Sequence, residues 1–392
     1  MTEAVIVDAI RTPIGKRGGA LSGWHPTDLL GHVLSGLVER NGIDPALVDD
    51  VIGGCVTQRG EQSTNVTRNA WVAAGLPQSV PATTVDRQCG SSQQAVHFAA
   101  QGVMAGAYDL VIACGVESMS RAPMASNASG GTGPFSPQFL AACDGQLKLQ
   151  FEVAQKIAND WDITRADMDA FALESHRRAS AATKAGEFGR EILPTAVRDE
   201  NGNDTTEILT EDQGIRHDAS LEKMASLPSA HFQPELAPDI TAGNSSQMND
   251  GAAGMLIASR ETAQKLGLTP RAAFRHFAVG ADDAVWVLTA PNPVTRRFFE
   301  RTGLKAGDFD AIEINEAFAS ITMAWAREFG PDAAKLNPRG GAIAIGHPLG
   351  ASGIRLMTTM LHYLEDTNGR LGLQSMCEGG GQANVTVIER LD

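Results

Sequence analysis

The sequence lacks the features that define several protein classes. Only five of its 392 residues are cysteine, and no two of them form a Cys-x-x-Cys pair. A disulfide framework needs paired cysteines in an oxidising compartment, so this odd set predicts reduced thiols that are either buried or reactive. No stretch approaches the roughly 18 uninterrupted apolar residues of a transmembrane helix. The sequence therefore indicates neither a disulfide-rich protein nor a helical membrane protein.

Positive charge is also scarce. The 32 Lys and Arg residues are outnumbered by 46 Asp and Glu residues, which gives a net charge of −14, and no basic block stands out. We therefore expect no nucleic-acid partner, although a local cluster can still bind a small anionic ligand. The first residues run directly into a predicted strand without the basic and apolar segments of a secretion signal, and the last four are not a peroxisomal or retention signal. We expect a soluble cytoplasmic protein with no membrane partner and no metal site.

What is present is the pattern of an α/β protein. The chain is longer than one hydrophobic core usually serves, and its 43% hydrophobic and 20% charged residues are ordinary for globular proteins. Short apolar runs alternate with helical patterns throughout. The expected strands include Ala4–Val7, Asp50–Val56, Asp109–Cys114, Ala311–Ile314 and Leu371–Met376, and the expected helices include Ser91–Ala105 and Gly350–Leu364.

The two ends of the chain resemble each other. Segments 46–53 and 306–313 both read as a helix exit that leads into a strand. Cys89 lies 39 positions after Asp50, and His347 lies 37 positions after Asp310, so each stands at the junction between a loop and a helix in its own half. Residues 119–248 break the pattern and read as an insertion. Such an insertion often carries binding loops, and a purely decorative one is an equally good explanation from the residues alone.

Cys89 is the strongest candidate nucleophile. Small residues follow it and a helix begins nearby, so its thiol would meet free backbone N–H groups and the positive end of the helix dipole, which favour a thiolate. A single cysteine in an α/β protein is more often an inert buried residue. That interpretation suits Cys55 and Cys114, which lie in strand-like runs. Cys143, in the insertion, has no recognisable partner.

His347 stands in a glycine-rich stretch, residues 337–353, at the end of an apolar run. We expect it at the C-terminal edge of a strand, where α/β sheets bind ligands. The stretch lacks the lysine of a phosphate-binding P-loop.

Two further segments carry candidate groups. Cys377 precedes the three glycines 379–381, whose N–H groups could converge on an oxyanion, although a flexible hairpin tip is the alternative. Asn315 follows an expected strand, where it could hold a water or a carbonyl oxygen or cap a helix.

Together these segments, with Arg11–Gly15 and Thr241–Ala252, resemble the thiolase family in order and spacing over nearly the whole chain. The resemblance implies an α/β fold of two duplicated βαβαβαββ halves in five αβαβα layers, with an inserted loop domain. It divides the chain into a first half (1–118 plus 249–268), a loop domain (119–248) and a second half (269–392).

The resemblance also implies residue roles. Cys89 would be the acylated nucleophile and His347 its base. Cys377 would protonate the enolate carbon and then deprotonate the incoming coenzyme A, while Asn315 would hold a water. The N–H groups of Cys89 and Gly379 would form an oxyanion hole.

The family's ligand requirements follow from the same resemblance. Arg216 and Ser246 match positions that contact coenzyme A, and the inserted domain would cradle that molecule. Coenzyme A would be a substrate, with no tightly bound cofactor, and the assembly would be a homodimer or homotetramer.

The implied reaction is thiolytic cleavage of a 3-oxoacyl-CoA into acetyl-CoA and a shortened acyl-CoA, through an acyl-Cys89 intermediate. Segments 55–58, 149–154 and 212–214 look closer to actinobacterial thiolases of lipid and steroid side-chain breakdown, which predicts a degradative role and an acyl group larger than acetoacetyl. The alternatives are a biosynthetic acetoacetyl-CoA thiolase, a ketoacyl synthase and a non-catalytic acyl-CoA-binding relative. A ketoacyl synthase lacks the second cysteine.

Four positions depart from the family pattern. Asp86 replaces the usual asparagine, Ser92 and Ala383 replace glycines, and Glu378 stands where small or apolar residues are usual. A carboxylate beside Cys377 would raise the pKa of that thiol if it pointed inward. We therefore expect Glu378 to point outward.

Overall fold

The structure is a computed structural model that describes residues 2–391. Its strands are β1 (Ala4–Arg11), β2 (Gly15–Lys16), β3 (Asp50–Gly54), β4 (Ala82–Val85), β5 (Leu110–Ser118), β6 (Thr195–Arg198), β7 (Asp204–Leu209), β8 (Asn249–Ser259), β9 (Ala272–Ala281), β10 (Ala311–Ile314), β11 (Leu371–Glu378) and β12 (Gln382–Arg390). Its α-helices are α1 (Pro26–Asn41), α2 (Val66–Ala73), α3 (Ser91–Met104), α4 (Pro137–Ala142), α5 (Gln150–Asp160), α6 (Arg165–Lys184), α7 (Leu221–Ala225), α8 (Arg260–Lys265), α9 (Pro291–Thr302), α10 (Ala319–Phe329) and α11 (Leu349–Thr367).

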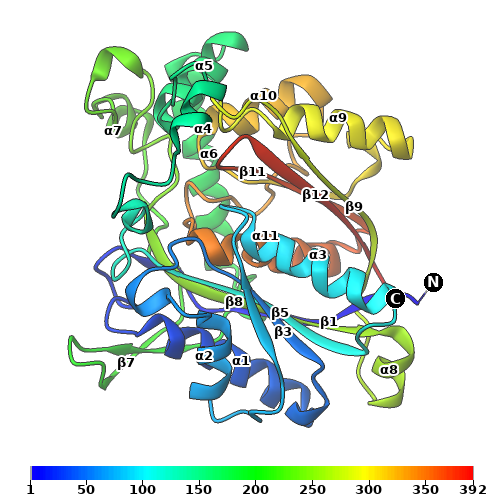
Figure 1. The fold of residues 1–392 in the computed structure, drawn as a ribbon. Coiled ribbons are helices and arrows are strands. Elements are labelled where there is room, and N and C mark those ends of the chain that lie inside the picture. The colour runs from blue at the N-terminus through cyan, green and yellow to red at the C-terminus, as the bar shows by residue number, and fades with distance from the viewer. Residues whose placement is uncertain (1, 392) are drawn as a thin grey trace.

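The main sheet folds back around two central helices. Its strand order is β10-β11-β12-β9-β1-β8-β5-β3-β4, with β2 paired to β8. The two halves meet at β1 and β9 through only two residue pairs, Val5 with Ala273 and Ile6 with Ala272. Figure 1 shows β9, β11 and β12 on one side of α3 and α11, and β1, β5 and β8 on the other.

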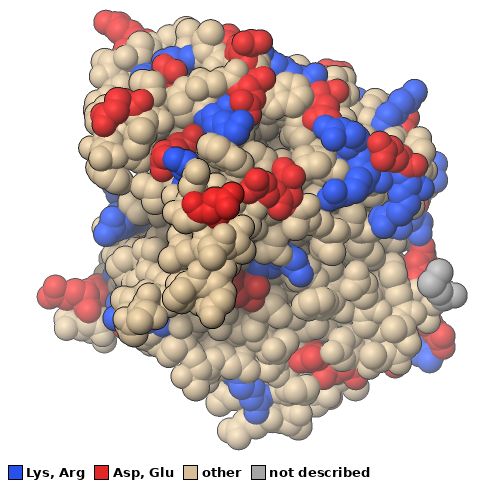
Figure 2. Space-filling view, turned by 45° about the horizontal axis from the view of Figure 1, so that its top comes forward, with Lys and Arg blue, Asp and Glu red and all other residues tan. Residues whose placement is uncertain are grey.

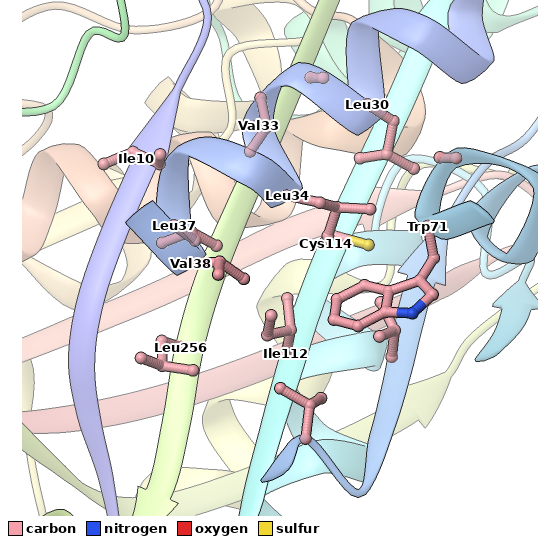
Figure 3. Packing of buried hydrophobic residues seen from close by; sticks show 14 of the residues in the cluster. Ile10, Leu30, Val33, Leu34, Leu37, Val38, Trp71, Ile112, Cys114 and Leu256 are labelled. Carbon is pink, nitrogen blue, oxygen red and sulfur yellow. The ribbon is translucent and has the colours of Figure 1, made fainter. Parts of the chain in front are cut away.

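The apolar clusters follow this layering. One fills the space between α1, α2 and the outer face of the first half-sheet, and Figure 3 shows Leu34 and Trp71 packed over Ile112 and Cys114 there. A second surrounds α3 and α11, and a third lies between the second half-sheet and helices α9 and α10. The predicted five-layer αβαβα fold is confirmed.

The duplication is visible in the element order. The first half runs β1-α1-β3-α2-β4-α3-β5-β8, and the second runs β9-α9-β10-α10-α11-β11-β12. Where β4 stands in the first half, the second has only an isolated parallel bridge between Ile312 and Leu336. Cys89 and His347 each lie two residues before the central helix of their own half, because α3 begins at Ser91 and α11 at Leu349.

The expected elements differ from the observed ones mainly in length. β10 has its predicted bounds, whereas β5 continues to Ser118 with every residue buried, including Glu117. In the insertion, residues 150–184 form two helices, α5 and α6, which are separated near Asp162, whose φ is 52°. A left-handed residue cannot continue a right-handed helix, and Thr164 then caps α6 by accepting from the Asp167 N–H.

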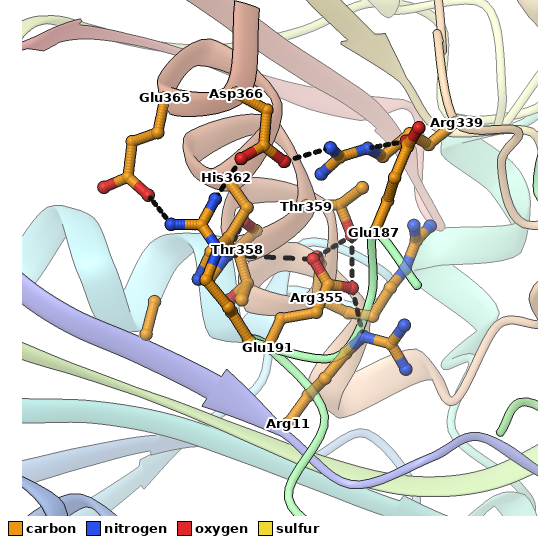
Figure 4. Close-up of polar contacts among 12 residues, drawn as sticks. Arg11, Glu187, Glu191, Arg339, Arg355, Thr358, Thr359, His362, Glu365 and Asp366 are labelled. Atoms are coloured by element: carbon orange, nitrogen blue, oxygen red, sulfur yellow. Dashed lines mark hydrogen bonds and ion pairs between the residues drawn. The ribbon is translucent and has the colours of Figure 1, made fainter. Parts of the chain in front are cut away.

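Buried ion pairs join the insertion to the rest of the fold. Arg11 donates from Nε to Glu191 Oε1 at 2.7 Å and forms two bonds with Asp212, at 2.6 and 2.9 Å. Thr359 on α11 also donates to Glu191 Oε1, at 3.0 Å (Figure 4). The two carboxylates hold the pKa of Arg11 above its usual value despite its burial. These contacts fix the segment 191–212 against β1 and α11.

Among residues 2–391, no helix has both the length and the apolar character needed to cross a membrane.

Gly350, in the first turn of α11, provides a test of the central packing. A Cβ at this position would overlap the Val116 carbonyl oxygen and lie 2.8 Å from the Gly54 carbonyl oxygen. Because neither backbone can move freely, Gly350→Ala should destabilise the protein by about 1–3 kcal/mol, as overpacked core substitutions do. Urea unfolding followed by circular dichroism measures this.

Gly307 is the matched control, because a Cβ there meets no atom within 4 Å. Gly307→Ala should shift stability by less than about 0.5 kcal/mol, as most unconstrained surface changes do. Equal stability of the two variants would contradict the close packing of α11.

Candidate active site

Cys89 is placed by a tight turn. Gln88 has φ of 49°, in the left-handed region that costs a non-glycine residue roughly 1–3 kcal/mol unless its surroundings hold it there. Asp86 Oδ1 accepts from the Gln88 N–H at 2.7 Å. The Ser91 hydroxyl donates to the Gln88 carbonyl oxygen at 2.6 Å and accepts from the Arg87 N–H at 2.9 Å. The turn therefore presents Cys89 at a fixed position just ahead of α3.

The Cys89 thiol lies in a mostly apolar pocket. It is 5% exposed and packs with Val56, Met119, Leu349 and Met376. Burial raises the pKa of Cys89 to about 12, and the nearby Glu378 carboxyl contributes to the rise, while the N–H groups of Cys89 and Gly379 act to lower it. The sequence-based expectation that the helix end would favour a thiolate is wrong for the free protein, because burial outweighs it. The thiol needs a base.

His347 is held as a neutral imidazole. Its backbone N–H donates to Asn249 Oδ1 at 2.9 Å, and its Nδ1 lies 2.6 Å from Ser352 Oγ. The Ser352 hydroxyl already donates to the Pro348 carbonyl oxygen at 2.8 Å, so Nδ1 must carry the proton that it shares with Ser352. This tautomer leaves a lone pair on Nε2, which lies 3.3 Å from Asn315 Nδ2. Burial, followed by the charge of Arg355, lowers the pKa of His347 to about 3, so the ring is uncharged at neutral pH.

The apolar run before His347 is not a strand, contrary to the sequence-based expectation. Ile345 donates to the Gly341 carbonyl oxygen at 2.8 Å and Gly346 to that of Ala342 at 3.0 Å, which closes a helical turn. The side chains of Ala344 and Ile345 fill a separate small cluster under the insertion. An apolar run of four residues fits a buried turn as well as a strand, and periodicity cannot distinguish the two.

Asn315 and Cys377 come from neighbouring parallel strands. β10 pairs with β11, and just beyond the paired residues Asn315 donates its N–H to the Ser375 carbonyl oxygen at 3.1 Å. Asn315 Oδ1 is buried and has no hydrogen-bond partner among the described residues, so it is available to a ligand or water. The alternative role of Asn315 as a helix cap is wrong, because Phe318 occupies the N-cap of α10.

Cys377 is fully buried among the apolar residues that line α10 and the insertion. Burial raises the pKa of Cys377 well above its usual value, and the neighbouring Cys89 and Glu378 raise it further. The second cysteine is therefore within electrostatic reach of the first, and both rest as thiols.

The two residues predicted to contact coenzyme A lie on segments packed against this region. Ser246 is half-buried and donates its N–H to the Ala317 carbonyl oxygen at 2.9 Å, two residues after Asn315. Arg216 is exposed and follows Ile215, which packs with Ile345. Gln247 joins the two segments, because its Nε2 lies 2.9 Å from the carbonyl oxygens of both Gly214 and Ile343.

Three of the four departures from the family pattern have simple local roles. Asp86 closes the turn before Cys89, as described above. Ser92 Oγ accepts from the Ile354 N–H at 3.1 Å and so links α3 to α11. Ala383 is the register partner of Cys377 in the β11–β12 hairpin.

The fourth departure corrects the expectation stated above. Glu378 does not point outward: it is 0% exposed, and its carboxyl lies against Gly90, next to the nucleophile. No local pattern predicts this orientation, because Glu378 ends a strand just before three glycines, where a carboxylate is usually solvated.

Three supporting residues were missed from the sequence. Asn249 and Ser352 orient His347, and Glu117 accepts from the N–H groups of Val56 at 3.0 Å and Gly350 at 2.9 Å. A signal existed for Ser352, which follows His347 by five residues in the first turn of an expected helix. A signal also existed for Glu117, a carboxylate in an apolar run.

A cavity lies outside the region of Cys89 and His347. A cavity of about 400 Å³ behind Glu316 is lined by Phe171, Met323 and Leu336 and contains none of the predicted catalytic side chains. Within residues 2–391, no group of three or more His, Cys, Asp or Glu side chains is arranged to hold a metal ion.

Comparison with known proteins gives consistent matches over the whole chain. Residues 4–261 match the family described as thiolase, N-terminal domain, and residues 268–390 match thiolase, C-terminal domain. The chain is 49% identical to the steroid 3-ketoacyl-CoA thiolase FadA6 of Mycobacterium tuberculosis, covering 100% of this chain and 95% of that protein. It is 43% identical to the beta-ketoadipyl-CoA thiolase of Pseudomonas putida, with full coverage of both. The crystal structure of the Bacillus anthracis acetyl-CoA acetyltransferase superposes with a TM-score of 0.88 at 33% identity, covering 100% of this chain and 99% of that one.

The bond between His347 and Ser352 can be tested directly. Ser352→Ala removes the acceptor that fixes the tautomer, so acylation of Cys89 by an acyl-CoA ester should slow by about fivefold, the equivalent of one hydrogen bond of roughly 1 kcal/mol. Stopped-flow or quench-flow measurement of the acylation rate checks this.

Ser320→Ala is the matched control. The Ser320 hydroxyl is equally buried and donates to the Ala154 carbonyl oxygen, away from His347. Acylation should be unchanged in this variant. An unchanged rate in Ser352→Ala would show that Ser352 does not orient the base.

Proposed function

The chain belongs to the thiolase family and is an acyltransferase, and we propose that it cleaves 3-oxoacyl-CoA esters whose acyl group is larger than acetoacetyl. One observation carries the proposal: two buried thiols, Cys89 and Cys377, lie within electrostatic reach of each other, and the Gly379 N–H faces the first of them. A thiol that accepts an acyl group and a second thiol that transfers protons are what a thiolytic cleavage requires.

The first half-reaction begins at Cys89. His347 Nε2 accepts the thiol proton, and the resulting thiolate attacks the C3 carbonyl of the 3-oxoacyl-CoA. The N–H groups of Cys89 and Gly379 donate to the oxyanion that forms on C3, and loss of one such donor typically costs about 10²–10³ in rate. The C2–C3 bond then breaks, which leaves the acyl group on Cys89 and releases the enolate of acetyl-CoA.

The enolate is stabilised and then protonated by His347, Asn315 and Cys377. Protonated His347 and a water held by Asn315 stabilise its oxygen, and the Cys377 thiol protonates its carbon. After acetyl-CoA departs, the Cys377 thiolate takes the proton from the thiol of a second coenzyme A. That sulfur attacks the acyl-Cys89 thioester and releases the shortened acyl-CoA, so the kinetics are of the ping-pong type.

Coenzyme A is a substrate here and not a bound cofactor. We assign its binding to the inserted segment 119–248, treated as a loop domain between the halves 1–118 plus 249–268 and 269–392. Ser246 would meet the pantetheine arm beside Asn315, and Arg216, exposed on the adjoining segment, would meet the nucleotide. The contacts of Gln247 support this assignment, because they hold both segments against the stretch before His347.

The size of the acyl group is inferred from relatives. FadA6 is described as acting on steroid 3-ketoacyl-CoA esters and the Pseudomonas putida relative on beta-ketoadipyl-CoA, and neither name refers to acetoacetyl-CoA. The biosynthetic alternative would need acetoacetyl-CoA as the preferred ester. The ketoacyl synthase and non-catalytic alternatives leave the buried Cys377 beside Cys89 without a role.

We also propose a homodimer or homotetramer in the cytoplasm. On the face shown in Figure 2, charged side chains gather in the upper part and the lower part is mostly uncharged. Depletion of charge is typical of subunit interfaces. Two large apolar side chains are also exposed, Phe98 on α3 and Val279 on β9, with 44% and 52% of their surfaces accessible.

The identity of the nucleophile is tested by alkylation. Iodoacetamide should modify Cys89 selectively and abolish turnover, and prior incubation with an acyl-CoA should protect it, since the acylated sulfur cannot react. Peptide mass spectrometry identifies the modified residue. Cys89→Ala should lose activity, whereas Cys114→Ala, a change in a buried thiol of the α1 cluster, should retain it. Activity that survives Cys89→Ala would refute the mechanism.

The substrate class is tested by comparing kcat/KM for acetoacetyl-CoA with that for longer and steroid-derived 3-oxoacyl-CoA esters. We expect the larger esters to be preferred by at least about tenfold, as a pocket that buries one or two further methylenes would give. A preference for acetoacetyl-CoA would support the biosynthetic alternative.

A further inference from the structure

Glu378 is a buried carboxyl group that the proposed mechanism does not use. It is the last residue of β11 and directly follows Cys377. The side chain is inaccessible to solvent, and neither carboxyl oxygen has a hydrogen-bond partner among residues 2–391. Burying an ionised, unpaired carboxylate is far more costly than burying a neutral carboxylic acid, so the environment favours the protonated form.

The carboxyl is aimed at the nucleophile's turn. A Cβ built on Gly90 would overlap Glu378 Oε1 and would lie 2.9 Å from Asn384 Nδ2. Position 90 therefore has room only for glycine, because the Glu378 carboxyl fills the space that a Cβ would occupy. Both polar side-chain atoms of Asn384 are also buried without a hydrogen-bond partner in the described part of the chain. Glu378 is opposite Gln382 in the hairpin register, so Asn384, two residues further along β12, shares its face.

The charged and titratable groups around Glu378 are few. From the Cys89 turn, Arg87 faces it and acts to lower its pKa, but the Arg87 Nη1 donates to Gln382 Oε1 at 2.9 Å, and no ion pair joins the two residues in the described part of the chain. The thiols of Cys89 and Cys377 are close enough for the Glu378 carboxyl to raise the pKa of both. Glu117 is the other carboxyl that acts on Cys89. Burial dominates this balance and raises the pKa of Glu378 to about 8.

We propose that Glu378 is a positioning residue that stands behind the Cys89 turn as a neutral carboxylic acid, and that its ionisation in alkaline solution holds Cys89 in the thiol form. The geometry supports this because the carboxyl contacts the backbone next to the nucleophile and not the reacting atoms. A negative charge so close to the sulfur opposes a thiolate there. The inference rests on the proposed role of Cys89 as the nucleophile.

The direction of the effect with pH follows from the titration of Glu378. Below about pH 7 the group is neutral, and glutamine imitates it in size and polarity, so Glu378→Gln should behave like the native protein. Above about pH 8 the native protein acquires a carboxylate beside Cys89 and the variant does not. Thiolate formation at Cys89 should then be easier in the variant.

The experiment measures the rate of Cys89 alkylation by iodoacetamide between pH 6 and 10 in the full-length protein. We expect equal rates for native protein and Glu378→Gln below pH 7, and a rate about tenfold higher in the variant at pH 9.5, since one pKa unit is a tenfold change in thiolate. Glu378→Leu also removes the ionisable group, so it should show the same divergence if glutamine disturbs folding. Glu389→Gln, at the far end of the same hairpin, removes a carboxylate whose pKa is lowered, and its profile should match the native one.

The outcomes separate this inference from the function it rests on. Coincident profiles over the whole pH range would show that the carboxyl does not act on Cys89. A constant ratio at every pH would show that Arg87 keeps Glu378 ionised throughout, which would also overturn the proposal. Alkylation at a residue other than Cys89 would instead refute the assignment of the nucleophile.

Discussion

The close approach of the N-termini of α3 and α11 is the constraint on which the rest of the structure depends. Both helices lie between the two halves of the sheet, and each carries a reactive side chain two residues ahead of its first turn. The absence of a Cβ at Gly350 lets α11 reach the backbone of β3 and β5, and the bond from the Ile354 N–H to Ser92 joins the helices. Glu117 on β5 supports α11 there by accepting N–H groups from Val56, after β3, and from Gly350 in α11. A duplicated unit can build a site from two equivalent positions only when its copies meet face to face in this way.

The same packing determines the chemistry of the free protein. Burial raises the pKa of Cys89 and lowers that of His347, so the proposed nucleophile and its proposed base both rest uncharged. A buried ion pair would have to offset the large cost of removing two charges from water, and the apolar neighbours of Cys89 offer little to do so. In the proposed mechanism, a bound ester supplies the oxygen on which the negative charge of the reaction is stabilised. The fixed N–H groups of Cys89 and Gly379 are oriented before the charge forms, which is what makes such donors effective.

The sequence predicted those features that depend on order along the chain. It predicted the alternation of strands and helices, the bounds of β10 and the equivalent positions of Cys89 and His347. Folding does not change the order or spacing of residues along the chain, so these features could be predicted. The sequence did not predict the features that depend on which residues pack against one another in the fold. The run 342–345 is a buried turn, Cys89 is a protonated thiol, and Glu378 points inward. The Glu378 side chain points inward because Gly90, 288 positions earlier in the chain, has no Cβ and leaves room for it. The residues around Glu378 in the sequence do not indicate that space.

The departures from the family pattern are therefore of two kinds. Asp86 closes its own turn and Ser92 joins α3 to α11, and each does so by accepting a hydrogen bond. Glu378 instead shares one buried face of a hairpin with Asn384, and the polar side-chain atoms of both lack a hydrogen-bond partner among residues 2–391. Unpaired buried polar groups destabilise a protein unless something else requires them. Two such residues on one face, behind the turn that holds Cys89, are better explained as one unit than as two independent features. The glycine at position 90 belongs to that unit, since any larger residue there would displace the carboxyl.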